Sequence, residues 1–382
     1  MPMLKVGLIE QPLHTRYVPA ALIGLGYLTA IGTGADSYWV PDHINSLFPP
    51  AVMTAKYVGT ARLVSDIEAH YDPWTVLGHL VARNRWGRRR LGIGVTDTGR
   101  RNPAVIAQAA ATLHLLTRGR TILGIRTVAR ASNEPYGVDW SKPVARFEEA
   151  VATIRALWNS GGELVTWDSP FFPLHNAAFR LPPYRGTWPR MWIASHGPRM
   201  LRVTGRYADG WFPAAFHYRP KDYAGGLQSV RSAASDAGRD PLSVTAAGMF
   251  FVLTGHRRDH IDEALDSPPI KAIALNTSAR VWARHGVSHP LGEHFTGAQD
   301  IIPQVFDEQT VLSLTADVPR SLLRKTLLTG TPAEIVDQVA EWRDHGLQYV
   351  VLSNLSGIQR SLRRGLSANL PFGRILHGLR KL

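Results

Sequence analysis

The chain of 382 residues contains no cysteine. A disulfide framework is therefore excluded, and so is a zinc or redox site built on cysteine. No apolar run approaches the roughly 20 residues that a transmembrane helix needs. The first ten residues lack the long apolar stretch of a signal peptide and instead predict a strand that begins at once. These absences favour a cytoplasmic protein.

Several signature motifs are missing as well. The sequence has no His-Glu-x-x-His, no P-loop, no Gly-x-Ser-x-Gly and no intact Gly-x-Gly-x-x-Gly after a predicted strand. His256 and His260 are four residues apart, but Arg257 and Arg258 stand between them, and we interpret this segment as a solvated helix face. No metal site is predicted.

Charge of one sign dominates. Lys and Arg number 43 against 30 Asp and Glu, a formal net charge of +13, and such a field attracts anions. Nucleic-acid binding is not predicted, because no helix-turn-helix, zinc-finger or RNP-type pattern is present and the basic residues are spread along the chain. A solvated basic surface, or attraction of a phosphorylated cofactor, is favoured.

Short apolar runs alternate with longer stretches of helical periodicity along the chain. This alternation is typical of βα units around a parallel sheet. Eight runs suit a closed barrel, so the predicted fold is α/β, a (β/α)8 TIM barrel. The predicted strands are Leu4 to Ile9, Ser37 to Val40, Leu91 to Val95, Thr121 to Ile125, Met191 to Ala194, Gly210 to Phe212, Thr245 to Thr254 and Gln348 to Ser353.

Capping chemistry marks several helices. Asn102 and Pro103 form a helix start before an Ala-rich run. Thr331 and Glu334 form a capping box with Pro between them. Between residues 146 and 160, apolar side chains recur at helical spacing and predict a helix that faces the core.

Two regions break the alternation, namely residues 163–184 and 285–325. We interpret both as insertions in one barrel domain that covers residues 1–382. Because a (β/α)8 barrel carries its site at the carboxyl ends of its strands, loops there can enlarge a substrate site, and both insertions are compatible with that role.

An acid and a histidine, Asp42 and His43, directly follow the second predicted strand. A histidine can donate a proton to a developing alkoxide, and an adjacent carboxylate can orient its ring or hold its imidazolium form. The alternative is a helix cap beside a packed histidine, and the dipeptide alone does not decide between the two.

Glycines and small residues mark two further strand ends. Gly92 and Gly94 lie inside the third predicted strand, where glycine indicates a bulge, a close backbone approach to a ligand, or tight packing. Residues 192–198 run from an apolar strand into a Gly-Pro helix start, whose amides could hold phosphate or whose Gly-Pro could serve the turn alone.

Taken together, these segments resemble the luciferase-like superfamily, and within it the deazaflavin (coenzyme F420) dependent branch with its mycobacterial lipid ketoreductases. The likeness extends over nearly the whole chain. It is carried by Trp39 to His43, Gly94 to Thr96, Arg101 to Val105, Asn133 to Gly137, Val144 to Ala150, Ala194 to Pro198, Gly205 to Gly210, Gly330 to Pro332 and Asp337 to Arg343.

The resemblance implies a bulge with a non-prolyl cis peptide near Ile93 and Gly94, behind the coenzyme ring. It implies that Asp42 and His43 face that ring and that the segment from Ala194 seats the phosphate end of the coenzyme. The catalytic residues are then His43 and Asp42. The implied coenzyme-binding residues are Asp42, Ile93, Gly94, Thr96, Thr127, Ala194, Ser195, His196 and Gly197.

The chain departs from the family after the fourth strand. The family has a Gly-rich, Glu-containing turn, whereas this chain has Arg126 to Arg130, with Ala129 in the place of the glutamate. Bulky Arg126 and Val128 stand where smaller residues would let the ring approach. The coenzyme then sits differently, or activity is reduced or lost.

The implied reaction is hydride transfer from reduced F420 to the carbonyl carbon of a long-chain lipid ketone, with His43 protonating the oxygen. A flavin mononucleotide (FMN) monooxygenase and a barrel that only binds ligand are the alternatives. A homodimer and peripheral membrane contact through the substrate are compatible with this reading. Candidates for an apolar lining are Phe171, Phe172, Phe179, Trp188, Trp211, Phe212 and Phe216.

Overall fold

The structure is a computed structural model that describes residues 3–87, 89–127, 130–139 and 141–382. Eight parallel strands close into a barrel, since β11 pairs with β1 and β8 pairs with β9. The (β/α)8 prediction is confirmed, and the predicted strands agree with the observed ones to within two residues. They are β1 (Lys5–Ile9), β2 (Ser37–Val40), β3 (Arg90–Asp97), β4 (Thr121–Arg126), β7 (Arg190–Ile193), β8 (Gly210–Trp211), β9 (Thr245–Thr254) and β11 (Tyr349–Asn354).

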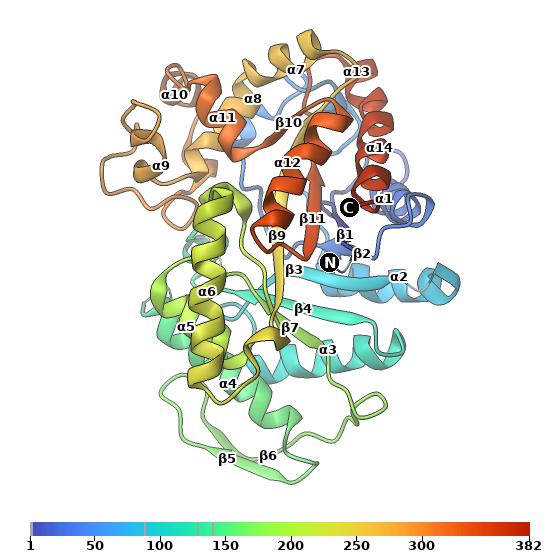
Figure 1. Cartoon of the computed structure of the whole chain (residues 1–382), viewed down its shortest axis with the longest axis vertical. Helices are drawn as coiled ribbons and strands as arrows, with labels where there is room; N and C mark the ends of the chain where they lie inside the picture. The colour runs from blue at the N-terminus through green and yellow to red at the C-terminus, as the bar shows by residue number, and fades with distance from the viewer. Residues whose placement is uncertain (1–2, 88, 128–129, 140) are drawn as a thin grey trace.

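Helices cover the outside of the barrel (Figure 1). The Asn102 side chain caps its helix by accepting a hydrogen bond from the Ala104 N–H at 2.9 Å, and the capping box of Thr331 and Glu334 is present. Both helix starts were predicted. The covering helices are α1 (Ala21–Gly32), α2 (Pro73–Gly87), α3 (Pro103–Leu116), α4 (Pro143–Trp158), α5 (Pro198–Tyr207), α6 (Pro220–Asp236), α12 (Pro332–Asp344), α13 (Leu362–Ser367) and α14 (Asn369–Leu379).

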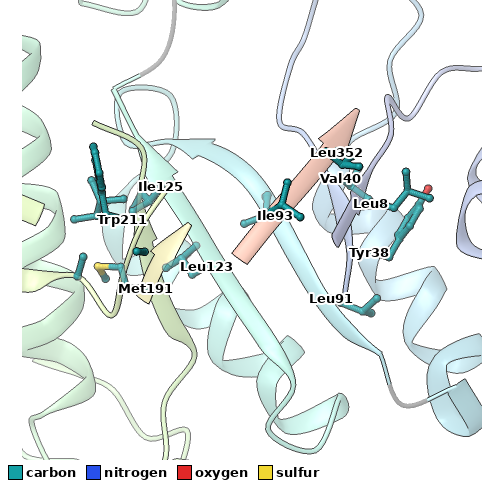
Figure 2. Close-up of a cluster of buried hydrophobic side chains, with 14 of the residues drawn as sticks. Leu8, Tyr38, Val40, Leu91, Ile93, Leu123, Ile125, Met191, Trp211 and Leu352 are labelled. Atoms are coloured by element: carbon teal, nitrogen blue, oxygen red, sulfur yellow. The ribbon is translucent and has the colours of Figure 1, made fainter. Parts of the chain in front are cut away.

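Side chains alternate between the two faces of the barrel wall. Outward residues build the main core beneath the helices, and Figure 2 shows Leu8, Tyr38 and Leu123 among them. Inward residues fill the lumen with aromatic rings. The Trp39 ring lies 5.2 Å from that of Trp192 and 5.0 Å from that of Phe212, measured between centroids. The barrel is therefore a packed core rather than a channel.

The glycines of β3 make room for this lumen. A methyl group at Gly92 would lie 2.2 Å from Cε3 of Trp39, and one at Gly94 would lie 3.0 Å from Cδ1 of Ile9. The predicted bulge is present as a register shift between Ile93 and Thr96. The non-prolyl cis peptide joins Gly94 to Val95, one bond beyond the expected place.

The segment 163–184 forms an antiparallel hairpin of β5 (Leu164–Trp167) and β6 (Leu174–Ala178). It lies between α4 and β7, so it belongs to the amino end of the barrel (Figure 1). Trp188 stacks on Trp158 of α4 at 5.7 Å and meets Phe179 edge-on at 5.9 Å. The prediction that this segment could enlarge a substrate site was therefore wrong. The prediction that Phe179 and Trp188 line such a site was wrong as well.

The segment 285–325 lies within the long connection from β9 to β11, at the carboxyl end of the barrel. It packs a second apolar core around Leu253, Trp282 and Leu322. No helix in the described ranges is long and apolar enough to cross a bilayer. The elements of this connection are α7 (Arg258–Leu265), α8 (Pro268–Lys271), α9 (Ala279–Ala283), α10 (Glu308–Leu314), α11 (Arg320–Thr326) and β10 (Leu328–Gly330), which pairs with the end of β9 and was not predicted.

Candidate active site at the barrel mouth

The alternation of the strands brings three polar side chains to the carboxyl end of the barrel. Trp39 of β2 points inward, and counting in twos beyond it leads to His43. The same count leads from Ile122 of β4 to Arg126, and from Trp192 of β7 to His196. The strand ends therefore place His43, Arg126 and His196 above the aromatic lumen, at the barrel mouth.

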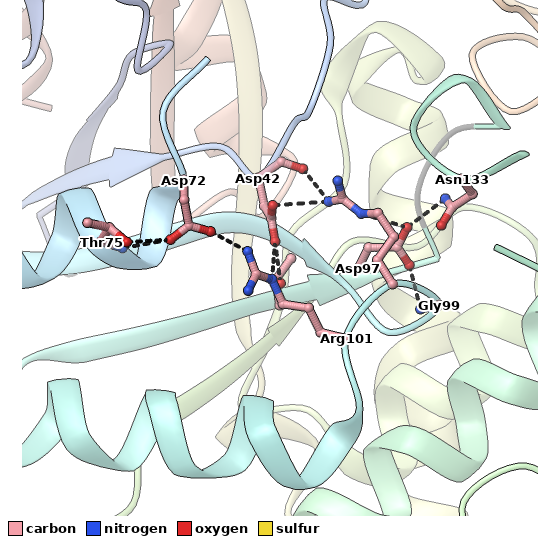
Figure 3. A network of polar contacts seen from close by, with 9 residues as sticks. Asp42, Asp72, Thr75, Asp97, Gly99, Arg101 and Asn133 are labelled. Atoms are coloured by element: carbon pink, nitrogen blue, oxygen red, sulfur yellow. Dashed lines mark hydrogen bonds and ion pairs between the residues drawn. The ribbon is translucent and has the colours of Figure 1, made fainter. Parts of the chain in front are cut away.

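Asp42 holds the loop that carries His43. Thr96 Oγ1 donates to Asp42 Oδ2 at 2.6 Å, and Arg100 Nη2 donates to the Asp42 carbonyl at 2.8 Å and to Oδ1 at 3.0 Å. Arg101 lies 3.4 Å from Oδ2 (Figure 3). Asp42 is 2 % exposed, and its carboxylate ties the loop after β2 to the end of β3. Its direct part in chemistry stays a prediction.

Asp97 anchors the neighbouring side of the mouth. Its carboxylate accepts hydrogen bonds from the Gly99 N–H at 2.7 Å and from Asn133 Nδ2 at 2.6 Å (Figure 3), and it lies 3.7 Å from Arg100 Nε. Burial raises the pKa of the Asp97 carboxyl, while these bonds and the charges of Arg100 and Arg126 oppose the rise. Arg100 thus bridges the two carboxylates, which makes this rim rigid.

His43 is largely buried at the mouth, and its Nδ1 has no hydrogen-bond partner among the described residues. Burial lowers the pKa of His43 well below its usual range, and the positive charge of Arg126, together with His70 and Arg100, pushes it the same way. The imidazole is therefore neutral at pH 7, with one N–H to donate and one nitrogen to accept.

Two further histidines, His196 and His217, lie side by side after β7 and β8. The rings of His196 and His217 lie 4.2 Å apart, and neither ring nitrogen of His196 has a partner in the described part of the chain. Burial lowers the pKa of His196 well below its usual range, helped by His217 and Arg126, and lowers that of His217 to about 3. Both rings are neutral at pH 7.

Arg126 is the cation that these histidines share. Its Nε is buried without a hydrogen-bond partner among the described residues. Sequence reasoning treated Arg126 as an obstacle and missed His217 altogether. The inward count from Ile122 marks Arg126. His217 instead ends a 3-10 turn that comes after the two-residue strand β8, and neither element carries such a count. Val128 and Ala129, named in the same argument, lie outside the described residues.

The predicted coenzyme-binding residues fall into two groups. Ile93 points outward into the main core, and Thr96 is engaged by Asp42. Ser195 also turns outward, where its Oγ lies 2.7 Å from that of Thr204 on α5. Those side chains do not face the barrel axis. The positions left at the mouth or beside it are Gly94, Ala194, His196 and Gly197, the exposed residue before α5. The role of Thr127, which directly follows Arg126, stays a prediction.

Apolar rings stand beside the histidines. Phe216 lies 4.3 Å from His217 and stacks on Phe251 at 5.8 Å, and Phe48 packs against Phe251 at 6.3 Å. Of the predicted lining, Phe216 is thus at the mouth. Phe212 lies deeper in the lumen, and Trp211 belongs to the main core.

Two surface cavities lie away from the mouth. One of about 550 Å³ is lined by Arg118, Arg120 and Arg185, near the amino end of the barrel. The other, of about 540 Å³, lies between Arg258 of α7 and Glu334 of α12. Neither contains the histidines, so the candidate site rests on the inward side chains themselves.

The fold and the site define a luciferase-like barrel. Residues 32–349 match the family model described as Luciferase-like monooxygenase. The chain belongs to this family, and the resemblance drawn from its motifs is confirmed.

Individual relatives have more specific names than the family model has. The chain is 57 % identical over 380 residues to the phthiodiolone/phenolphthiodiolone dimycocerosates ketoreductase of Mycobacterium tuberculosis (strain H37Rv), covering 99 % of each chain. The fold matches an F420-dependent secondary alcohol dehydrogenase, solved with an F420-acetone adduct, with a TM-score of 0.72 and 18 % identity over 98 % of this chain and 99 % of that one. It also matches a riboflavin lyase solved with modified FMN (TM-score 0.67, 18 % identity, 99 % and 92 % covered).

Proposed function

We propose that the protein is an F420-dependent ketoreductase that reduces the keto group of phthiodiolone and phenolphthiodiolone dimycocerosates to the alcohol. The observation that carries this proposal is the 57 % identity over 99 % of both chains to a ketoreductase of that name. The neutral donors at the barrel mouth, beside the apolar wall of Phe216 and Phe251, support it.

The described residues fit a polar ring system at the mouth. Buried polar atoms without partners are costly, and native proteins rarely leave several together. Here His43 Nδ1, both ring nitrogens of His196 and Arg126 Nε are in that state, above a floor formed by Trp39 and Trp192. Gly94, Thr127 and the segment 194–197 would hold the coenzyme, which supplies a hydride when bound in its reduced form.

The residues of the chain then do the remaining work. The neutral His43 ring places its N–H toward the ketone oxygen and passes a proton to it as the oxygen gains charge. Asp42, through Arg100 and Thr96, keeps the loop of His43 in place. The aromatic lumen excludes water from below, which strengthens every electrostatic interaction at the mouth.

Titration of the purified protein with oxidised F420 and with FMN, followed by fluorescence, tests the cofactor assignment. Selective F420 binding is expected. A preference for FMN would instead support the monooxygenase alternative, which the named relative does not favour. Binding of F420 without reduction of the lipid ketone would support a barrel that has lost activity.

Three further features belong to this proposal. We propose that the protein acts on its lipid precursor in the cytoplasm. The apolar substrate brings the mouth to a membrane surface for peripheral contact. A homodimer is compatible with the barrel helices, and the oligomeric state is measured directly by light scattering.

A further inference from the structure

Arg126 has an unusual place for an arginine. It is the last residue of β4, points inward, and stands opposite Asp97 in the register of β3 and β4. Burial lowers the pKa of its guanidinium, which nonetheless stays charged at neutral pH because an arginine begins so high. A permanent positive charge therefore sits in the wall of the barrel mouth.

No resident anion neutralises this charge closely. Asp97 attracts Arg126, but its carboxylate oxygens are bonded to Gly99 and Asn133 and lie beside Arg100. Within the described residues, Arg126 Nε is buried without a hydrogen-bond partner. The side chain as a whole is partly exposed, so this arrangement leaves the guanidinium open to a partner that arrives from outside.

The surrounding side chains are matched to such a partner. The inward alternation of the strands brings His43 and His196 to the same mouth as Arg126, and His217 lies 4.2 Å from His196 between ring centroids. The charge of Arg126 lowers the pKa values of all three histidines further, beyond the effect of burial. Neutral imidazoles can each donate an N–H without adding a second cation. The mouth thus offers one full positive charge and several neutral donors, which is the composition of an oxyanion-binding group.

We propose that Arg126, with the N–H groups of His43 and His196, forms an oxyanion-binding group that stabilises the negative charge on the ketone oxygen during reduction. In this step the hydride forms a new C–H bond at the carbonyl carbon, and the π electron pair of C=O moves to oxygen. The hydride would come from the reduced deazaflavin of the proposed function. The oxygen, held by Arg126, would take the N–H proton of His43, and water at the open mouth would then restore that proton to the ring. This catalytic role rests on the proposed ketone reduction.

An anion-binding mouth is testable without coenzyme or turnover. Decanoate carries a permanent oxyanion on an apolar chain at pH 7.5, and decanol has the same chain without the charge. Calorimetry on the wild-type protein should show decanoate binding at least about tenfold more tightly than decanol. Equal affinities would overturn the proposal, and this result is independent of whether F420 binds.

Variants assign the preference to Arg126. Arg126→Gln should abolish the preference for decanoate, and Arg126→Lys should retain part of it. Arg130→Gln is the matched control, because Arg130 lies just beyond the same strand but forms an ion pair with Glu134. Loss of the decanoate preference in Arg130→Gln would contradict the proposal, and so would a preference that survives in Arg126→Gln. Arg126→Met provides a second neutral side chain of similar length should the Gln variant fail to fold.

Turnover separates the catalytic claim from simple binding. Arg126→Gln should lower kcat by about 10²-fold to 10³-fold, the usual effect of losing one oxyanion donor, with a much smaller change in KM. Histidine NMR should show the pKa values of His43, His196 and His217 rising in the same variant. An unchanged kcat in active protein would refute the catalytic role even where decanoate binding is lost.

Discussion

At the scale of single residues, burial decides what each titratable group at the mouth can do. His43 was predicted from its place after a strand, but the sequence alone left open whether it would be an imidazolium held by Asp42. Asp42 instead bonds Thr96 and Arg100, and desolvation beside Arg126 keeps His43 neutral. The position of His43 after a strand could be predicted from the sequence. Its protonation state could not, because it depends on neighbours from other strands.

His43→Ala tests the proton-transfer role. We expect kcat for the lipid ketone to fall by about 10²-fold to 10⁴-fold, the range for loss of a positioned general acid. The affinity for oxidised F420, measured by fluorescence, should change little. His70→Ala is a useful comparison, because His70 lies near His43 but belongs to a different loop. An equal loss of activity in both variants would contradict a specific role for His43.

Glu10 carries a prediction about pH and stability. Its side chain lies under α1, where a methyl group on Gly26 would collide with it, and burial raises the pKa of the carboxyl to about 7 against a weak opposing hydrogen bond from Tyr38. The unfolded chain ionises near pH 4.5, while the folded protein resists ionisation. The contribution of Glu10 to stability is therefore full below pH 4.5 and is lost as the pH rises toward 7.

Glu10→Gln removes this penalty. The free energy of unfolding at pH 8 should rise by as much as about 3 kcal/mol, from the shift of the pKa between the two states, with little gain at pH 4. Urea unfolding at the two pH values measures the difference. Glu163→Gln, at an exposed position, is the control. A gain of equal size at both pH values would rule out this explanation.

At the scale of elements, short apolar runs predicted the barrel strands, because a strand buried on both faces reads as a continuous apolar run. The three-residue β10 was missed since so short a run carries no pattern. The hairpin of β5 and β6 was recognised as an insertion, but its end of the barrel depends on whether it precedes or follows a strand. The order of α4, the hairpin and β7 could be read from the sequence. The error therefore lay in how the topology of the barrel was applied, and not in a signal missing from the sequence.

Gly92→Ala tests the packing of β3 against the lumen. A methyl group there would lie 2.2 Å from the Trp39 ring, and overpacking of a tight core costs typically 1–3 kcal/mol, so we expect roughly that loss in the free energy of unfolding. Gly78→Ala is the control, because no atom outside its own helix lies within 4 Å of the added methyl group. Equal stability of the two variants would show that the lumen is looser than described.

The two ends of the barrel should respond differently to aromatic truncation. Trp188→Ala removes the stack on Trp158 at the amino end, so thermal stability should fall while KM for the lipid ketone stays unchanged. Phe216→Ala acts at the mouth beside His217, and KM should rise several-fold. Steady-state kinetics with thermal melts on both variants provide the comparison. A raised KM in Trp188→Ala alone would reverse the assignment of the two ends.

At the scale of the whole molecule, the net charge and the family both agree with an anionic coenzyme. A net charge of +13 suits an anionic coenzyme tail, and the fold is shared with F420-dependent and FMN-containing proteins alike. Fold similarity at 18 % identity therefore does not choose the cofactor. The assignment of F420 to this chain is thus a proposal, and the titration with F420 and FMN tests it.

The most direct test is a single-turnover reaction of the protein with reduced F420 and phthiodiolone dimycocerosate under anaerobic conditions. F420 oxidation is followed by its absorbance, and the lipid is analysed by mass spectrometry. We expect one alcohol to form for each F420 oxidised, with no product when reduced FMN replaces F420. Failure of F420 to be oxidised by the ketone, or product formation that requires FMN and oxygen, would contradict the proposed function.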